Sequence, residues 1–387
     1  MTRVRVRMLR GANALALALF LVLLTAACSR IATPEGWSAG VVKDDALYIG
    51  TAEGSLLAVN RTDGSTIWRR DLLAAEGVDQ AIYGKPAVAD DVVYVGGYNG
   101  SLYAFALDGD PAKFDNQPMG GPIVGGPALA GDVLVVGTAI DESRDGDSGA
   151  VHAVDAETGD TLWRFPADGG VWSAPTVVDG VVYFGTLGKT VFAVNLEDGA
   201  ELWRRNTGGA VVASPLVANG RVYVGAFDSA FYALDAQTGN VDWKFTESER
   251  WYWTQALALD GTIYAPSLDG NMYALDANTG AKLWTFESEG SIVGSPAVVS
   301  GMLAIPVSDG GESKVHLLEF NGSPKDNCRI GENIFTPLVA EGDLIYFAAT
   351  DKSIRALSVS GNGNPDEAWV YFTDKDDPLP RDRAKAC

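Results

Sequence analysis

The chain repeats itself with a period of about 40 residues, and this repeat constrains the fold more than any other feature. The stretch from Pro175 to Arg205 recurs almost at once as Pro215 to Phe245. Each copy contains four short segments of β-branched and aromatic residues, separated by turns such as Asp-Gly and Asn-Gly. The segments are too short and too often broken by glycine for helices, so each copy is expected to form a four-stranded antiparallel sheet.

Such sheets must stack on one another, because a lone four-stranded sheet leaves both of its faces uncovered. Eight units follow one another between residues 37 and 372, at spacings of 40 to 48 residues. The residues that open their first strands are Gly40, Pro86, Pro127, Pro175, Pro215, Ala256, Pro296 and Pro337. The sequence therefore predicts an all-β fold, an eight-bladed β-propeller of four-stranded antiparallel blades.

A turn followed by a tryptophan marks the end of the clearest units. In one of them the turn is Asp235 to Gly239 and the tryptophan is Trp243; Asp and Thr side chains bond nearby N–H groups, and Gly takes the positive φ. The tryptophan recurs as Trp68, Trp163, Trp203, Trp243, Trp284 and Trp369, with Phe114 near this place in unit two and no aromatic residue in unit seven. With this turn, the units resemble the PQQ-like (quinoprotein-type) repeat, in which the tryptophan packs against the neighbouring blade.

Residues 1–27 have the features of a lipoprotein signal peptide. Four arginines precede an apolar run of 11 residues, Ala14 to Leu24, which is short for a membrane span. The residues from Leu24 to Cys28 resemble a bacterial lipobox, which predicts lipid on Cys28; an ordinary signal peptide with an incidental cysteine is the alternative. The protein is then anchored on the periplasmic face of the outer membrane in a Gram-negative cell, or on the outer face of the cytoplasmic membrane otherwise.

The rest of the chain divides into three parts. Residues 28–36 are expected to be a tether, residues 37–372 the propeller, and residues 373–387 a charged and largely irregular tail. Without its first 27 residues, the chain keeps 25 Lys and Arg against 50 Asp and Glu. Such a charge repels nucleic acid, so no nucleic-acid partner is expected.

Two cysteines remain beside Cys28 in what is expected to be an oxidising compartment. Cys328 is placed in the loop that leads into unit eight, and Cys387 ends the tail. A disulfide between them would hold the tail on the propeller. Two unrelated thiols are the alternative.

No set of residues predicts catalysis or a bound cofactor. His152 and His316 occupy a third-strand position that is aromatic in most units, which favours packing. The Asp and Asn residues that begin the turns, such as Asp235, occur one per unit around the propeller. They are expected to stabilise the turns and not to form a site. The insertion in unit three carries Asp141, Glu142, Asp145 and Asp147, a weak Ca²⁺ candidate that a solvated acidic loop explains better.

An apolar position three residues before each first strand is the strongest candidate for a binding surface. It reads Trp37, Tyr83, Val124, Trp172, Val212, Trp253, Val293 and Ile334. Trp251 and Tyr252 precede Trp253, and three consecutive large aromatic residues exceed what packing within a repeat requires. The sequence predicts an exposed contact surface there, with packing between blades as the alternative.

The propeller behind a lipoprotein signal resembles the BamB family of the outer-membrane β-barrel assembly machinery. In that family the propeller is a scaffold that contacts the central barrel-inserting subunit through loops on one face. The resemblance implies a non-catalytic, membrane-anchored scaffold for protein–protein interaction, with a BamB-like role in outer-membrane protein assembly. The family's Leu-Arg-Gly-x-Ser-Ala-Pro loop is matched only at Ser173, Ala174 and Pro175, which leaves the partner open.

Two other functions stay open from the sequence. The aromatic residues that precede the first strands could bind a glycan or small ligand outside the cytoplasm. PQQ-dependent dehydrogenases share the repeat, but they often carry an adjacent cysteine pair that this chain lacks.

Overall fold

The computed structural model describes residues 38–72, 81–112, 114, 116–139, 148–374, 377–379 and 387. They belong to the second of two units, Met1–Gly36 and Trp37–Cys387. Cys28, Trp37 and the acidic loop from Asp141 to Asp147 lie outside the described residues. In the part of the chain that is described, no helix is long and apolar enough to cross a membrane.

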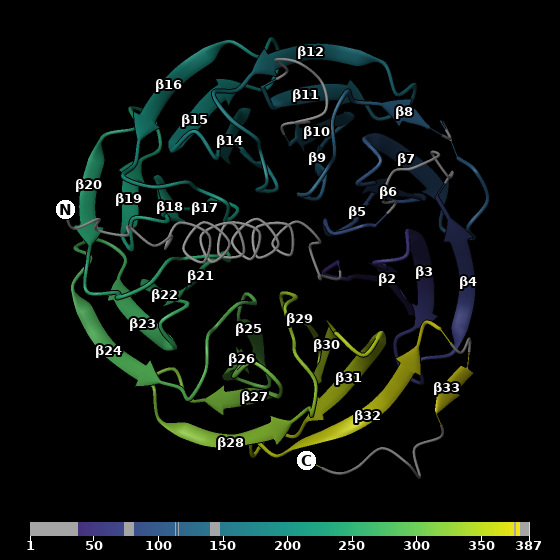
Figure 1. Cartoon of the computed structure of the whole chain (residues 1–387), viewed down its shortest axis with the longest axis vertical. Helices are drawn as coiled ribbons and strands as arrows, with labels where there is room; N and C mark the ends of the chain where they lie inside the picture. The colour runs from purple at the N-terminus through teal and green to yellow at the C-terminus, as the bar shows by residue number, and fades with distance from the viewer. Residues whose placement is uncertain are drawn as a thin grey trace, which may run out of the picture. The chain divides into compact units, whose positions relative to one another are not determined.

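Eight antiparallel sheets, counted over the described residues, are arranged as the blades of one propeller (Figure 1), which confirms the predicted fold. Their strands run in chain order from the centre outward. Blades one to four are β1–β4 (Val41–Lys43, Ala46–Gly50, Ser55–Asn60, Thr66–Asp71), β5–β8 (Ala87–Val88, Val92–Gly96, Ser101–Ala106, Gln117–Pro118), β9–β12 (Ala128–Ala130, Val133–Thr138, Ala150–Asp155, Thr161–Pro166) and β13–β16 (Thr176–Val178, Val181–Gly185, Thr190–Asn195, Glu201–Asn206). Blades five to eight are β17–β20 (Leu216–Ala218, Arg221–Gly225, Phe231–Asp235, Val241–Phe245), β21–β24 (Leu257–Leu259, Thr262–Pro266, Asn271–Asp276, Lys282–Glu287), β25–β28 (Ala297–Val299, Met302–Ser308, Ser313–Leu318, Pro324–Arg329) and β29–β33 (Val339–Glu341, Leu344–Ala349, Ser353–Val359, Pro365–Phe372, Asp377–Leu379).

The burial of each strand follows its place in the blade. The two middle strands, such as β14 and β15, are buried on both faces, because neighbouring blades cover them on both sides. The outer strand β16 alternates between exposed and buried residues, and Trp203 is its buried member. The hydrophobic core therefore lies between the blades, in clusters that each join two neighbours.

An aromatic ring and a glycine fasten neighbouring blades together. The indole of Trp203 donates a hydrogen bond to the carbonyl of Ala236 in the next blade, at 2.9 Å, and the hydroxyl of Tyr183 donates to the same oxygen at 3.2 Å. Gly239 of that turn, at φ +66°, lies over the indole, where an added Cβ would come within 2.5 Å of the ring. This packing confirms the role expected of the fourth-strand tryptophan.

The same contact closes the propeller between blades eight and one. Trp369 of β32 donates from its indole to the carbonyl of Arg61 at 3.0 Å, and Gly64 lies over its ring. The hydroxyl of Tyr346 donates to the Arg61 carbonyl as well, at 3.2 Å. The first and last blades are thus joined by side-chain contacts, and among the described strands none is exchanged between their sheets.

Two glycines of blade six allow the glycine–indole contact to be measured. Gly280 has φ +70° and an added Cβ would lie 2.6 Å from Trp243, whereas Gly261 has φ +77° and open space around it. Both substitutions by alanine meet the same backbone strain, but only Gly280→Ala also crowds the indole. We expect Gly280→Ala to be less stable than Gly261→Ala by about 1–3 kcal/mol in chemical denaturation. Equal losses in the two variants would contradict the glycine–indole contact.

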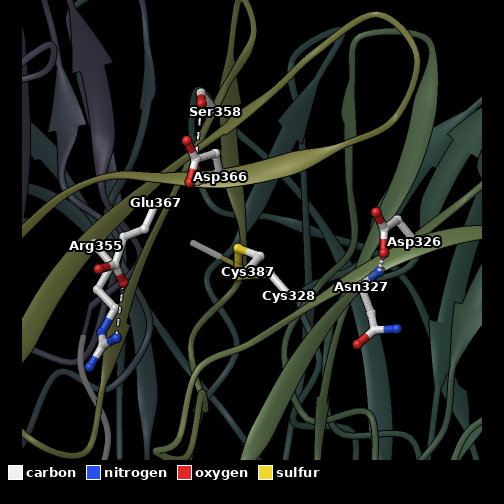
Figure 2. The surroundings of a disulfide bond; sticks show 8 residues. All are labelled: Asp326, Asn327, Cys328, Arg355, Ser358, Asp366, Glu367 and Cys387. Carbon is white, nitrogen blue, oxygen red and sulfur yellow. Dashed lines mark hydrogen bonds and ion pairs between the residues drawn. A yellow bond between two sulfur atoms is a disulfide. The ribbon is translucent and has the colours of Figure 1, made fainter. Parts of the chain in front are cut away.

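Three residues of the C-terminal tail form a strand that the sequence did not predict. Residues Asp377–Leu379 form β33, a fifth strand that pairs with β32, whose outer edge would otherwise be unpaired. The expectation of a largely irregular tail is wrong for these residues. Cys328 was also misplaced: it lies within β28, the outer strand of blade seven, and not in the loop into blade eight. The structure joins Cys328 and Cys387 in a disulfide (Figure 2).

Candidate interaction surface

One face of the propeller carries the aromatic residues that the sequence singled out. In an antiparallel four-stranded blade, the loop between the second and third strands lies at the same end as the connection to the next blade. Backbone hydrogen bonds join the two kinds of segment: Phe227 N donates to Ala210 O at 2.9 Å, and Leu268 N donates to Trp251 O at 3.0 Å. We call the surface formed by these loops and connections the aromatic face.

Three rings form a stack on the aromatic face. Phe227, from the loop between β18 and β19, stacks on Trp251 with centroids 4.6 Å apart and on Trp253 with centroids 5.7 Å apart. The interplanar angles are 12° and 21°, so the rings are close to parallel. Trp251 is 49% exposed and Trp253 41% exposed, which makes this stack a large apolar surface open to solvent.

Tyr252 does not belong to this surface, and the prediction that it does is wrong. It is fully buried and packs against Phe231, with centroids 5.3 Å apart. Side chains alternate along an extended segment, so Trp251 and Trp253 point outward while Tyr252 points into the core. Gly225 makes room for the buried ring, since an added Cβ there would collide with Tyr252.

Hydrogen bonds hold the connection that presents the two tryptophans. The Ser248 hydroxyl donates to Arg250 O at 2.7 Å, and Glu249 N donates to the Asp269 carboxylate at 3.0 Å. Burial raises the pKa of Asp269, but N–H donors from Asn271 and Glu249, together with the Tyr273 hydroxyl, outweigh burial and lower this pKa below its usual value. Asp269 is therefore ionised at neutral pH, and its hydrogen bonds hold the connection in place.

Two other predicted aromatic residues, Trp172 and Tyr83, lie on different parts of the same face. Trp172, in the connection between blades three and four, is 38% exposed. Tyr83 precedes blade two and is half-buried against Tyr98 in an edge-to-face contact, with centroids 5.5 Å apart. Val212 occupies the same position in the connection between blades four and five, and it is buried.

In blade eight, the residue at the apolar position before the first strand is Phe335. The prediction of Ile334 for this position is wrong by one residue. The pairing Val339↔Tyr346 in blade eight matches Thr176↔Tyr183 in blade four, which shifts the alignment one residue away from Pro337. Ile334 is consequently buried, whereas Phe335 is half-buried at the position of Trp172.

Phe227 was not found from the sequence. Its loop places Phe227 where the neighbouring blades have Leu187 and Leu268, and an aromatic residue at that loop position was the available signal. This loop lies between two strands of one blade, apart from the connections in which the predicted apolar position recurs.

The other polar residues considered in the sequence, the turn residue Asp235 and the two histidines, form hydrogen bonds or packing contacts within the propeller. Asp235 accepts hydrogen bonds from the N–H groups of Gln237 and Thr238 and from the Thr238 hydroxyl, as a turn former does. His316 is half-buried beside Phe286, with ring centroids 5.3 Å apart, and His152 is buried. Within the described residues, no three His, Cys, Asp or Glu side chains come together as a metal ion would need.

The burial of His152 predicts a loss of stability on acidification. Desolvation, with a smaller contribution from Arg164, lowers its pKa to about 4. The unfolded chain therefore binds more protons than the folded chain between pH 4 and 6.5, so stability falls as the pH drops through this window. We expect the free energy of unfolding to fall by roughly 1.5–2 kcal/mol from this residue between pH 7 and pH 5.

The variant His152→Phe isolates this contribution, because the equivalent residue of blade four is Phe192. Urea denaturation at pH 7 and pH 5 should show a smaller pH dependence in His152→Phe than in the unmodified protein. An unchanged pH dependence would mean that His152 titrates normally in the folded state.

Comparisons with known proteins agree with this architecture. A family model described as outer membrane protein assembly factor BamB matches residues 36–146, 112–204, 147–252, 247–324 and 268–384. An outer membrane protein assembly factor BamB from Alteromonas naphthalenivorans is 27% identical over 136 residues, which is 35% of this chain and 24% of that protein. The chain thus matches only about a quarter of the length of this relative.

Two solved structures share the fold. The crystal structure of BamB from Moraxella catarrhalis has a TM-score of 0.68 at 18% identity, covering 82% of this chain and 95% of that one. A computationally designed protein, Ika8, has a TM-score of 0.70 at 17% identity, covering 84% of this chain and 96% of the designed one.

Proposed function

Because this chain belongs to the outer membrane protein assembly factor BamB family, we propose that it is a non-catalytic scaffold of outer-membrane protein assembly. In this proposal, lipid on Cys28 holds the protein at the periplasmic face of the outer membrane. The propeller docks a protein partner of the assembly machinery on the aromatic face. Neither a cofactor nor a catalytic residue is part of the proposal.

The observation that carries the proposal is the exposed stack of Phe227, Trp251 and Trp253. Tryptophan is enriched among the residues that contribute most to protein–protein binding, because its ring buries a large area on contact. Two tryptophans that are each more than 40% exposed leave this area in water in the isolated protein. A partner that covers the stack would remove it from solvent.

The surroundings of the stack resemble the organisation of a protein interface. Asp228, Glu249 and Arg250 adjoin the three rings in sequence, so charged residues flank an apolar centre. The hydrogen bonds of Ser248 and Asp269 order the connection in advance, which reduces the entropy lost on binding. These features favour docking of a folded partner or an ordered segment over a loose contact.

Affinity capture tests the proposed function. The lipidated protein would be expressed with a C-terminal tag in a Gram-negative host, and captured from detergent-solubilised envelope for mass spectrometry. We expect a β-barrel subunit of the assembly machinery to be recovered in near-stoichiometric amount. Recovery of the protein without any assembly subunit, from envelopes that contain the machinery, would overturn the proposal.

A further inference from the structure

The boundary between blades seven and eight lacks the aromatic fastening found at the other boundaries. Over the described residues, an aromatic ring lies under a turn glycine of the next blade at seven boundaries, and it belongs to the outer strand in all of them except blade two, where Phe114 precedes β8. The rings are Trp68, Phe114, Trp163, Trp203, Trp243, Trp284 and Trp369. In β28 the matching residue is Asp326, which is exposed. Gly363 of blade eight meets the sulfur of Met302 there instead of a ring.

The second strand of blade seven also lacks the tyrosine whose hydroxyl donates a hydrogen bond to the next blade. Ala304 occupies the position of Tyr183, which elsewhere donates to the next blade. A shorter donor compensates in part: the hydroxyl of Ser300 donates to Val359 O at 2.7 Å. This boundary therefore keeps an apolar core around Met302 and Val359, but it has neither the tyrosine nor the tryptophan.

Cys328 faces blade eight from the strand that lacks the ring. It lies two residues after Asp326 in β28, and residues two apart point to the same side of a strand. The matching residues of other blades reach across their boundaries: Phe245 contacts Tyr273, with centroids 4.9 Å apart, and Arg205 donates to Gly239 O at 2.6 Å. Cys328 is buried, so its sulfur lies within the boundary core.

The tail supplies the other half of the link. Its strand β33 pairs with β32 of blade eight, and Cys387 then bonds to Cys328 of blade seven. The two cysteines are 59 residues apart, so the loop that the disulfide closes contains the whole of blade eight. Figure 2 shows the bond between Cys328 and Cys387.

We infer that the Cys328–Cys387 disulfide is a redox-dependent fastening of this boundary, which takes the place of the missing contact between an aromatic ring and the turn glycine. The bond forms by thiol–disulfide exchange with a disulfide-bearing oxidant. The two cysteine thiols lose two electrons and form one S–S bond, while the S–S bond of the oxidant breaks and its two sulfurs take up the electrons and the two protons. A dithiol reverses the step, and it reaches the exposed Cys387 more readily than the buried Cys328.

Hydrogen exchange on the full mature protein tests this inference. It would be measured for the oxidised protein, for the protein reduced with dithiothreitol, and for the double variant Cys328→Ser with Cys387→Ser. We expect amides of β28 and of β30–β32 to exchange at least about tenfold faster after reduction, because the opening of blade eight is no longer restrained. Amides of β16–β19, at the boundary of Trp203, should keep their rates, and the serine variant should not respond to reductant.

Three results would overturn the inference. Exchange in β28 and β30–β32 that is the same in oxidised and reduced protein would show that the bond does not fasten the boundary. An equal acceleration in all blades would show that it acts on the whole propeller and does not replace one local contact. Alkylation followed by mass spectrometry that finds two free thiols in protein purified without reductant would exclude the bond itself.

Discussion

Replacing Trp369 by alanine is expected to destabilise the propeller by about 3–5 kcal/mol, since the change leaves a large cavity between blades eight and one. Trp369 is 1% exposed, lies under Gly64 and donates to Arg61 O. Its removal takes away the indole hydrogen bond to the Arg61 carbonyl, which keeps the hydrogen bond from Tyr346. It also removes the ring–glycine contact that closes the propeller. Chemical denaturation followed by circular dichroism would give the change.

Trp251→Ala is the matched control for this experiment, because it removes the same side chain from a 49% exposed position. We expect it to change the free energy of unfolding by less than about 1 kcal/mol, as surface substitutions do. If the two variants lose equal stability, the contact between Trp369 and Gly64 does not close the propeller in the way described.

Removing the exposed rings is expected to abolish partner capture while the fold is kept. The double variant Trp251→Ala with Trp253→Ala should weaken binding of the assembly subunit by roughly thirtyfold or more, as expected when central aromatic residues of an interface are truncated. Quantitative capture from solubilised envelope, followed by titration with the purified subunit, would measure the loss. Unchanged hydrogen exchange in β18–β23 would show that blades five and six remain folded.

Leu283→Ala gives the comparison for an exposed apolar residue away from the aromatic face. Leu283 lies on the outer strand β24 and is 54% exposed, so it is at least as accessible as Trp251. Its replacement should leave capture unchanged. Equal losses from Leu283→Ala and from the double variant would argue for a general apolar effect and against docking on the stack.

The repeat predicted the fold because most of its contacts recur from one blade to the next. Strands are buried or half-exposed according to their place in the blade, and the Trp–Gly pair appears at a fixed distance from the turn. Each feature is local in sequence, so it is visible when the units are aligned. Phe114 illustrates the strength of this pattern, since it meets Gly159 where other blades use an indole.

The aromatic face was predicted less well, because exposure depends on single-residue alternation. A run of three aromatic residues indicates a surface but does not say which of them points inward, and Tyr252 points inward. In blade eight, aligning on Pro337 instead of on the strand register exchanged buried Ile334 for Phe335. Phe227 joins the stack from a separate loop, a contact that only the three-dimensional arrangement provides.

The strand at the outer edge of blade eight could not be predicted from the sequence pattern either. The charged residues of the tail gave no strand pattern, yet β32 offers an unpaired edge on which residues Asp377–Leu379 form a strand. The strand that contains Cys328 was not recognised for a related reason, because blade seven lacks the tryptophan that marks the fourth strand in six of the other units.

Site-specific photo-crosslinking tests the central claim, that the aromatic face is where the partner docks. A photoreactive phenylalanine analogue would replace Trp253 in one variant and Leu283 in another, in living cells that contain the assembly machinery. We expect the variant at residue 253 to form a crosslinked product with an assembly subunit, and the variant at residue 283 to form none. Crosslinks from residue 283 and none from residue 253 would contradict docking on this face.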